Sequence, residues 1–314
     1  MKKFFVLLSI TILTLSHLTF AQFKFDPANL DKSEKTIKKL VSEKIGDLKK
    51  HNVKKIIIFN CKGEFILSRT TSPGAWESKD MIYYNRHQIE EKIKTTESPV
   101  LNQEYCVYLT SKFLDAVIAM FKEAGIDVVP TETWQKHAVY QEMEKLMMDF
   151  DKDEGKSYGM FSQNVATRTL TVPAYDYRVL PENFIKMMKY MKLENNEKGR
   201  MLEDFDAQAF CNVTFRSNGA ESKPNITGIE LLFQTGLKKY NTGTKDKDGN
   251  KVFSYSMSAF PVLALKDIVQ YNNSTLNSRN FIDTKVYEKA ITEMYNYILS
   301  LYAETIKKCM TADK

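Results

Sequence analysis

The sequence is poor in the residue types and motifs that carry catalysis and metal binding. It contains four histidines, four cysteines and two tryptophans in 314 residues. It has no G-x-S-x-G elbow, no Walker A loop and no G-x-G-x-x-G loop, so the common signatures of nucleophilic catalysis and nucleotide binding are missing. The cysteines are too widely spaced for a C-x-x-C redox or zinc motif. The sequence therefore predicts no catalytic residue, no cofactor and no metal site.

Two segments begin like metal sites, and each lacks a required ligand. The acidic run 149–153 starts as a calcium loop does, but the alignment puts Glu154 where glycine is required and Met160 where a bidentate glutamate is required. The segment His87–Glu91 lacks the second histidine of a zinc protease motif. A solvated acidic loop explains the first segment, and neither predicts a bound metal.

The first 21 residues are typical of a bacterial export signal. Lys2 and Lys3 precede an uncharged, mostly apolar stretch from 4 to 18. Ala21 and the threonine two residues before it are small residues where a signal peptidase reads them, so we expect cleavage before Gln22. The alternative is a retained membrane anchor, but the apolar stretch is short beside the roughly 20 residues that a span needs.

After the signal, we expect one globular domain over residues 22–314, with an insertion near 150–205. Hydrophobic residues make up 43% of the chain and charged residues 27%, which allows a substantial core. Loss of Lys2 and Lys3 leaves 43 basic and 39 acidic residues, so the net charge falls from +6 to +4. No basic block with interleaved aromatics occurs, so nucleic acid is not an expected partner. We expect a soluble periplasmic or secreted protein with no transmembrane span.

Four cysteines remain after the signal: Cys61, Cys106, Cys211 and Cys309. Export places them in an oxidising compartment, where disulfides form. Of the three pairings that four cysteines allow, Cys61–Cys106 with Cys211–Cys309 is favoured, because each bond joins elements within one half of the chain. The alternative is four buried free thiols that pack as small hydrophobic side chains. The sequence leaves both states open.

Helical and strand patterns alternate early in the chain, and strands follow one another later. Apolar residues at helical spacing predict helices over 31–50, 104–124, 133–148, 182–191 and 283–309. Short β-branched or alternating segments predict strands at 54–59, 64–68, 126–129, 166–172, 211–215, 229–233 and 253–259. We therefore expect an α/β to α+β fold, with a mixed sheet, an antiparallel C-terminal meander and flanking helices.

Turn residues refine this prediction. Cys61–Gly63 is expected to form a turn between the first two strands, and Asp248–Gly249 to form a hairpin turn. Pro173 suggests that the strand before it lies at a sheet edge, since proline donates no ladder hydrogen bond. The helix at 283–309 has a coiled-coil-like repeat of only about three heptads, which favours a helix laid across the sheet.

Aromatic residues are the candidates for surface contacts. Tyr175 and Tyr177 flank an aspartate and could contact a sugar or a protein partner. Trp76 and Trp134 are the residues to check for the planar, exposed rings of a carbohydrate site. The alternative for all of them is core packing, which explains most aromatic residues.

Two short segments carry a family resemblance. EAGIDVVP at 123–130 ends a helix and opens a strand, and FDAQA at 205–209 opens another strand. This pattern resembles the periplasmic domain shared by the curli-secretion channel lipoproteins and the amino-terminal domain of TolB. The resemblance covers the order of elements over 54–260. The chain departs from it by the absence of a lipid-anchor cysteine after Ala21 and by the insertion at 150–205. The resemblance implies a non-enzymatic envelope role and supplies no site residues.

We therefore expect an exported envelope protein with a non-enzymatic binding or assembly role and a protein partner. The alternatives are an exported hydrolase, whose site is built from scattered residues, and a carbohydrate-binding protein. A deep pocket with converging ionisable groups would favour the enzyme. An exposed apolar surface would favour the partner-binding protein.

Overall fold

The structure is a computed structural model that describes residues 22–73, 94–144, 154–158, 163–175, 177, 198–221, 223–245, 249 and 251–312. Its strands are β1 (Gln22–Phe25), β2 (Val41–Lys44), β3 (Lys55–Pro73), β4 (Lys94–Glu97), β5 (Asp127–Val128), β6 (Glu154–Tyr158), β7 (Gln163–Pro173), β8 (Ala209–Asn218), β9 (Asn225–Lys245), β10 (Lys251–Ala259), β11 (Val262–Leu265) and β12 (Ile268–Tyr271). Its helices are α2 (Glu34–Leu40), α3 (Gly46–Lys50), α6 (Gln103–Glu123), α7 (Thr131–Trp134), α8 (Ala138–Glu144), the 3-10 helix η4 (Ser278–Ile282) and α10 (Thr284–Thr311).

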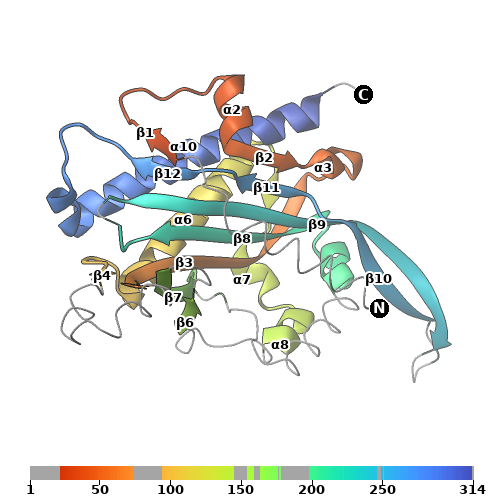
Figure 1. The fold of residues 1–314 in the computed structure, drawn as a ribbon. Coiled ribbons are helices and arrows are strands. Elements are labelled where there is room, and N and C mark those ends of the chain that lie inside the picture. The colour runs from red at the N-terminus through yellow and green to blue at the C-terminus, as the bar shows by residue number, and fades with distance from the viewer. Residues whose placement is uncertain are drawn as a thin grey trace, which may run out of the picture.

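One mixed, twelve-stranded sheet organises the molecule (Figure 1). Its main path runs β1-β12-β9-β8-β3-β7-β6, and the remaining strands pair with members of that path or, for β2, with β11. β3 and β8 are parallel, with Ile57 beside Phe210, whereas β8, β9 and β10 form an antiparallel meander. The predicted fold class, with its C-terminal meander and flanking helices, is confirmed.

α6 and α10 lie side by side on one face of the sheet (Figure 1). Phe113 of α6 stacks on Phe215 of β8 with ring centroids 4.8 Å apart, and meets Tyr295 of α10 edge-on at 5.5 Å. The Tyr302 hydroxyl of α10 donates a hydrogen bond to the Ile229 carbonyl of β9 at 2.8 Å. The last helix is therefore laid across the sheet, as the short repeat predicts.

α7 and α8 cover the opposite face of the sheet. Trp134 and Tyr140 pack around Phe59 of β3, and Phe59 meets Phe210 of β8 edge-on at 5.4 Å. Phe210 and Phe215 are five residues apart in one strand, so they point to opposite faces. Both faces of the central strands are thus covered by buried aromatic side chains.

The helix predicted over 31–50 is wrong in its middle part. The chain forms α2, then β2, then α3, because Val41–Lys44 pairs antiparallel with β11. Apolar residues do recur there at helical spacing, but the hydrogen bonds between β2 and β11 stabilise a strand instead of a helix. The N-cap is Ser33 rather than Asp31, since the Ser33 hydroxyl accepts a hydrogen bond from the Thr36 amide at 3.3 Å.

The predicted turn at Cys61–Gly63 is also wrong, because β3 runs straight through it. A Cβ on Gly63 would lie 2.2 Å from Oγ1 of Thr110, a buried residue of α6. This glycine lets a helix approach the strand closely, which is a known use of glycine inside strands. β7 is not an edge strand either: it pairs with β3 and β6, and Pro173 is its last residue.

The other helix predictions have mixed outcomes. α6 and α10 match the predicted ranges closely, and Gly125 after α6 has the left-handed φ of +77° that a helix C-terminus favours. The helix predicted over 133–148 is described only to residue 144, and up to there it is two short helices, α7 and α8. The helix predicted over 182–191 and residues 1–21 lie outside the described residues.

Candidate functional site

A two-stranded arm leaves the body of the sheet and projects toward the lower right of Figure 1. We define the arm as residues 236–245 of β9 together with β10. β9 pairs with β8 as far as Thr235, and beyond that residue it pairs with β10 alone among the described strands. All residues of β9 from Lys238 to Lys245 are exposed. The β9 strand of the arm is therefore exposed beyond Leu237, whereas Tyr255 of β10 remains buried.

Gly236 sits where the arm begins. Its φ is +72°, a conformation that side chains with a Cβ rarely adopt. A Cβ at this position would lie 2.3 Å from Oγ of Ser258 and 2.9 Å from Nε2 of His51. The Ser258 hydroxyl donates a hydrogen bond to the Gly236 carbonyl at 2.9 Å. Glycine is thus required by both the backbone angle and the close packing at the foot of the arm.

Glu203 holds the arm in one orientation. Its carboxylate, in the helical segment 198–204, accepts hydrogen bonds from Lys239 Nζ at 2.9 Å and from the Tyr255 hydroxyl at 2.8 Å. The hydrogen bond from Lys239 lowers the pKa of Glu203, and the same bond raises the pKa of Lys239. Charge-assisted hydrogen bonds of this kind are stronger than neutral ones. They fix the arm to the body near its base and leave its outer part uncovered.

Exposed aromatic side chains gather on the arm. Seven large apolar side chains are exposed in the described part of the chain, and three lie on the arm or directly after it. Tyr240 is 51% exposed, Phe253 43% and Phe260 57%. Tyr240 pairs with Ser254 of β10, so these two side chains point to the same face of the ribbon. Phe253 precedes Ser254 in the strand and therefore points to the opposite face. Exposed tyrosine and phenylalanine are enriched in protein interfaces.

The open edge of β10 gives the arm its second binding feature. Among the described strands β10 pairs only with β9, so its outer N–H and C=O groups face away from the sheet. Such an edge can accept an added strand from another chain. Lys238, Lys245 and Lys251 are exposed on the arm and give it a positive charge. The arrangement suits recognition of an extended acidic segment.

The two tyrosines predicted as surface contacts lie in different environments, one exposed and one buried. Tyr175 is 53% exposed, and its hydroxyl donates to Asp115 at 2.7 Å. Tyr177 is buried at 2% exposure, and its hydroxyl donates to the Ile58 carbonyl at 3.0 Å. Burial raises the pKa of Tyr177 far above its ordinary range. The surface prediction is wrong for Tyr177, because the chain after β7 turns inward and packs this ring 5.7 Å from Trp134.

Trp134, the tryptophan within the described residues, does not support a carbohydrate site. Trp134 is fully buried between Phe59 and Tyr140, so its ring offers no surface to a sugar. Trp76 lies outside the described residues. Trp134 is therefore a core residue and not an exposed ring of a carbohydrate site.

The structure corrects the disulfide pairing expected from the sequence. All four cysteines are free thiols, so neither Cys61–Cys106 nor Cys211–Cys309 forms. Cys61 and Cys211 are fully buried in the neighbouring strands β3 and β8. Cys309 lies instead against α3, where its Sγ is 3.4 Å from the Ile45 carbonyl. Burial raises the pKa of Cys106 to about 12, so this thiol packs as a small hydrophobic side chain.

Histidine and acidic residues do not converge on a metal site within the described ranges. His137 Nε2 contacts Asp204 at 2.9 Å, and its Nδ1 accepts a hydrogen bond from the Val139 amide. This histidine therefore joins two helical segments. His87 and the acidic run 149–153 lie outside the described residues. In the part of the chain that the structure describes, no helix has the length and apolarity needed to cross a membrane.

The sequence does not predict the arm, although it carries one signal for it. The predicted hairpin turn at Asp248–Gly249 would pair the residues before it with those after it, and β9 does pair with β10 from Thr235 to Lys245. The strand predicted at 229–233 does not include the part of β9 in the arm, because residues 238–245 are polar. Pairing across that turn requires a long strand, and β9 has 21 residues, with a buried first half and an exposed second half.

No family model, curated protein or solved structure matches this chain. Any functional assignment therefore rests on the residues and geometry of the chain itself.

Proposed function

We propose that this chain is an exported bacterial envelope protein that binds or assembles with another protein through the arm. The observation that carries the proposal is the arm itself, which combines exposed aromatic side chains, an open strand edge and a fixed base. A ribbon of two strands is marginally stable alone in water. A partner strand added to β10 would satisfy its outer edge, and the same partner would bury Tyr240 on one face of the ribbon or Phe253 on the other.

The sequence supports export and a non-enzymatic role. Residues 1–21 have the pattern of a cleaved signal, and this pattern supports a mature chain in the periplasm or outside the cell. The resemblance of residues 54–260 to the curli-secretion channel lipoproteins and TolB points to an envelope role. Both arguments remain predictions.

Site-specific photo-crosslinking in native cells tests the binding role. A photoreactive phenylalanine analogue at position 240 is expected to give one discrete protein adduct. The same analogue at Ile282, which is 60% exposed and outside the arm, is the matched control and is expected to give none. Adding Phe253→Ser to the position 240 variant is expected to reduce the adduct severalfold. Equal adducts at both positions, or no adduct at 240, would overturn the assignment of the arm.

Export is tested separately from binding. The protein recovered from the envelope or culture medium is expected to begin at Gln22 when its N-terminus is sequenced. Recovery of a cytoplasmic chain that still begins at Met1 would contradict export, whatever the crosslinking shows.

A further inference from the structure

The pairing register of the arm sorts its side chains onto two faces with different chemistry. Lys238 lies opposite Ser256, and Tyr240 lies opposite Ser254, so these four side chains share one face of the ribbon. We call this face the serine face. The two serines on β10 are short, whereas Lys238 and Tyr240 on β9 are long and exposed. A ligand at the outer edge of β10 can therefore reach the side chains of β9 across the serines.

The opposite face of the ribbon carries the apolar side chains of β10. Phe253, Tyr255 and Met257 alternate with the serines and therefore point to this face. Tyr255 is buried, and it lies so close to the helical segment 198–204 that a Cβ on Gly199 would be 2.4 Å from its Cβ. Phe253 is the most exposed of the three, at 43%. The edge of β10 thus has apolar side chains on one face and short polar ones on the other.

The charge of the arm is positive and mostly uncompensated. Lys238, Lys245 and Lys251 are exposed and form no ion pair among the described residues. Lys239, in contrast, is paired with Glu203 at 2.9 Å. The described residues of the arm include no carboxylate of their own. A second copy of this chain would bring two positive ribbons together, whereas an acidic segment would neutralise the lysines.

The backbone of β10 is arranged to accept an added strand. Its pairing with β9 is regular from Phe253 to Ala259, after an irregularity between Lys251 and Phe253. In a regular antiparallel pair, alternate residues direct their N–H and C=O groups toward the neighbouring strand and away from it. Every second residue of this segment therefore presents a donor and an acceptor at the outer edge. Main-chain hydrogen bonds to such an edge supply the affinity of strand addition, and side chains supply its specificity.

We propose that β10 binds an extended segment of another protein as an added strand, with alternate acidic side chains of that segment on the serine face. This inference rests on the binding role proposed for the arm and specifies the partner. Strands in a sheet lie about 4.8 Å apart, so the Cα of a glutamate beside Ser256 would lie about 10 Å from the Cα of Lys238. The two long side chains extend toward each other over the short serine and form a charge-assisted hydrogen bond there. The intervening residues of the segment point to the other face, beside Tyr255, and are expected to be apolar.

Titration of the mature chain with a synthetic peptide tests this inference. The probe is a short, capped peptide in which glutamate and valine alternate, and the control is the peptide with lysine in place of glutamate. The glutamate peptide is expected to bind at least tenfold more tightly than the lysine peptide. On binding, every second backbone amide over residues 253–257 should gain protection against hydrogen exchange, because alternate N–H groups of β10 face the added strand.

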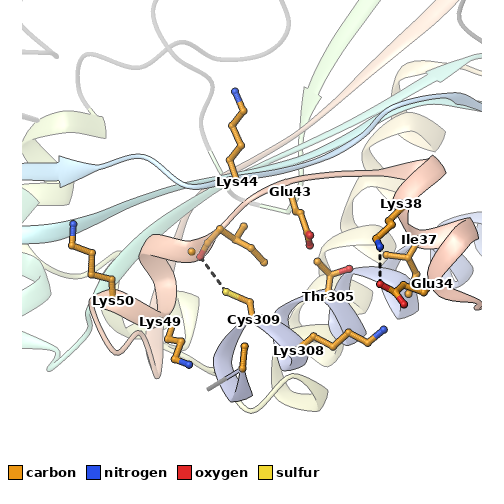
Figure 2. Close-up of a pocket in the computed structure, with 13 residues that line it drawn as sticks. Glu34, Ile37, Lys38, Glu43, Lys44, Lys49, Lys50, Thr305, Lys308 and Cys309 are labelled. Atoms are coloured by element: carbon orange, nitrogen blue, oxygen red, sulfur yellow. Dashed lines mark hydrogen bonds and ion pairs between the residues drawn. The ribbon is translucent and has the colours of Figure 1, made fainter. Parts of the chain in front are cut away.

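Three lysine variants separate a contact set by the register from attraction by charge alone. Lys238→Gln is expected to weaken binding of the glutamate peptide at least fivefold, because it removes the cation opposite Ser256. Lys245→Gln is the matched control on the arm, since Lys245 pairs with Lys251 beyond the irregularity. The groove between α3 and the end of α10 is lined by five lysines and would attract an acidic peptide by charge, so Lys49→Gln is the second control (Figure 2). Both controls are expected to stay within twofold of the parent.

Failure of strand addition and failure of the binding role give different results. Strand addition would be overturned if the glutamate peptide did not bind, if the lysine peptide bound as tightly, or if the amides of β10 gained no alternating protection. An equal loss of affinity in Lys238→Gln and Lys49→Gln would also overturn it, because the peptide would then respond to charge alone. A discrete crosslink from position 240 in any of these cases would keep the arm as a binding surface and would exclude only this mode of binding.

Discussion

The imidazole of His51 packs against Gly236 at the point where β9 leaves the sheet. A Cβ on Gly236 would lie 2.9 Å from His51 Nε2, which is too close for an undisturbed contact. His51 follows α3 directly, so this contact joins an N-terminal helix to the foot of the arm. The direction of the arm therefore depends on a residue nearly two hundred positions earlier in the chain as well as on the backbone angle of Gly236.

Substitution of Gly236 by alanine is expected to destabilise the fold and displace the arm. The left-handed backbone conformation alone costs about 1–2 kcal/mol for alanine. Gly243→Ala is the matched control, because Gly243 has φ +77° but no atom within 4 Å of its Cβ position. Urea unfolding should show a larger loss for Gly236→Ala than for Gly243→Ala, and His51→Ala should restore part of the difference. Equal losses in the two glycine variants would contradict the packing argument.

Tyr175 and Tyr177 provide a paired test of surface against core. Tyr177→Phe removes a hydroxyl that donates to the Ile58 carbonyl in the core and leaves that carbonyl without it. We expect a loss of about 1–2 kcal/mol in the free energy of unfolding. Tyr175→Phe removes a hydroxyl from an exposed ring, and the expected change is within about 0.5 kcal/mol. Chemical denaturation of both variants measures the difference, and a larger loss at Tyr175 would contradict the structure.

Thiol titration is expected to find four free cysteines in the unreduced, unfolded protein. In the folded protein Cys309 should react first, since Cys61, Cys106 and Cys211 are fully buried. Burial raises the pKa of Cys309 above its ordinary value of 9.0, so its reaction rate should still be rising with pH at 9. A disulfide between any pair in the mature protein, detected by mass spectrometry without reduction, would show that the oxidised chain differs from this structure.

The parts of the fold that were predictable are those set by local sequence. α6 and α10 span 21 and 28 residues, so their apolar repeats identify them without tertiary information. β2 was missed because its pairing with β11 is a long-range contact that no local pattern reports. Gly63 was assigned to a turn because the approach of Thr110 to β3 is a property of packing.

The candidate sites depended even more on long-range contacts. The point at which β9 becomes an exposed arm is set by Ala209, the first residue of β8, which pairs with Thr235. The sequence marks that boundary only by Gly236 and by the polar residues from Lys238 onward, and neither predicts that the strand continues past it. Lys49 and Lys308 are far apart in sequence, and they line the same groove only because α10 docks on α3 (Figure 2). Composition showed scattered lysines and could not show which of them share a cavity.

An ion pair between β3 and β8 makes the free energy of unfolding depend on pH in the acid range. The Arg216 Nε donates to Glu64 Oε2 at 2.7 Å, and Lys62 also pairs with this carboxylate. Burial opposes ionisation of Glu64, but the hydrogen bonds from Lys62 and Arg216 outweigh it, so the pKa of Glu64 lies below its ordinary value of 4.5. A carboxyl group whose pKa is lower in the folded state stabilises the fold above its unfolded pKa. That contribution is lost as the pH falls below 4.5 and through the folded pKa.

A double-mutant cycle of Glu64→Gln and Arg216→Gln measures this contribution directly. Arg216 is 38% exposed, so solvent screening limits the coupling at pH 7 to about 1 kcal/mol or less. The coupling should be present at pH 7 and should be smaller at pH 3, because the pH has then fallen below 4.5 and Glu64 begins to take up a proton. The Glu64→Gln variant should accordingly lose less stability than the parent between these two values. A coupling energy that stays the same at both would show that the contact acts through packing rather than through charge.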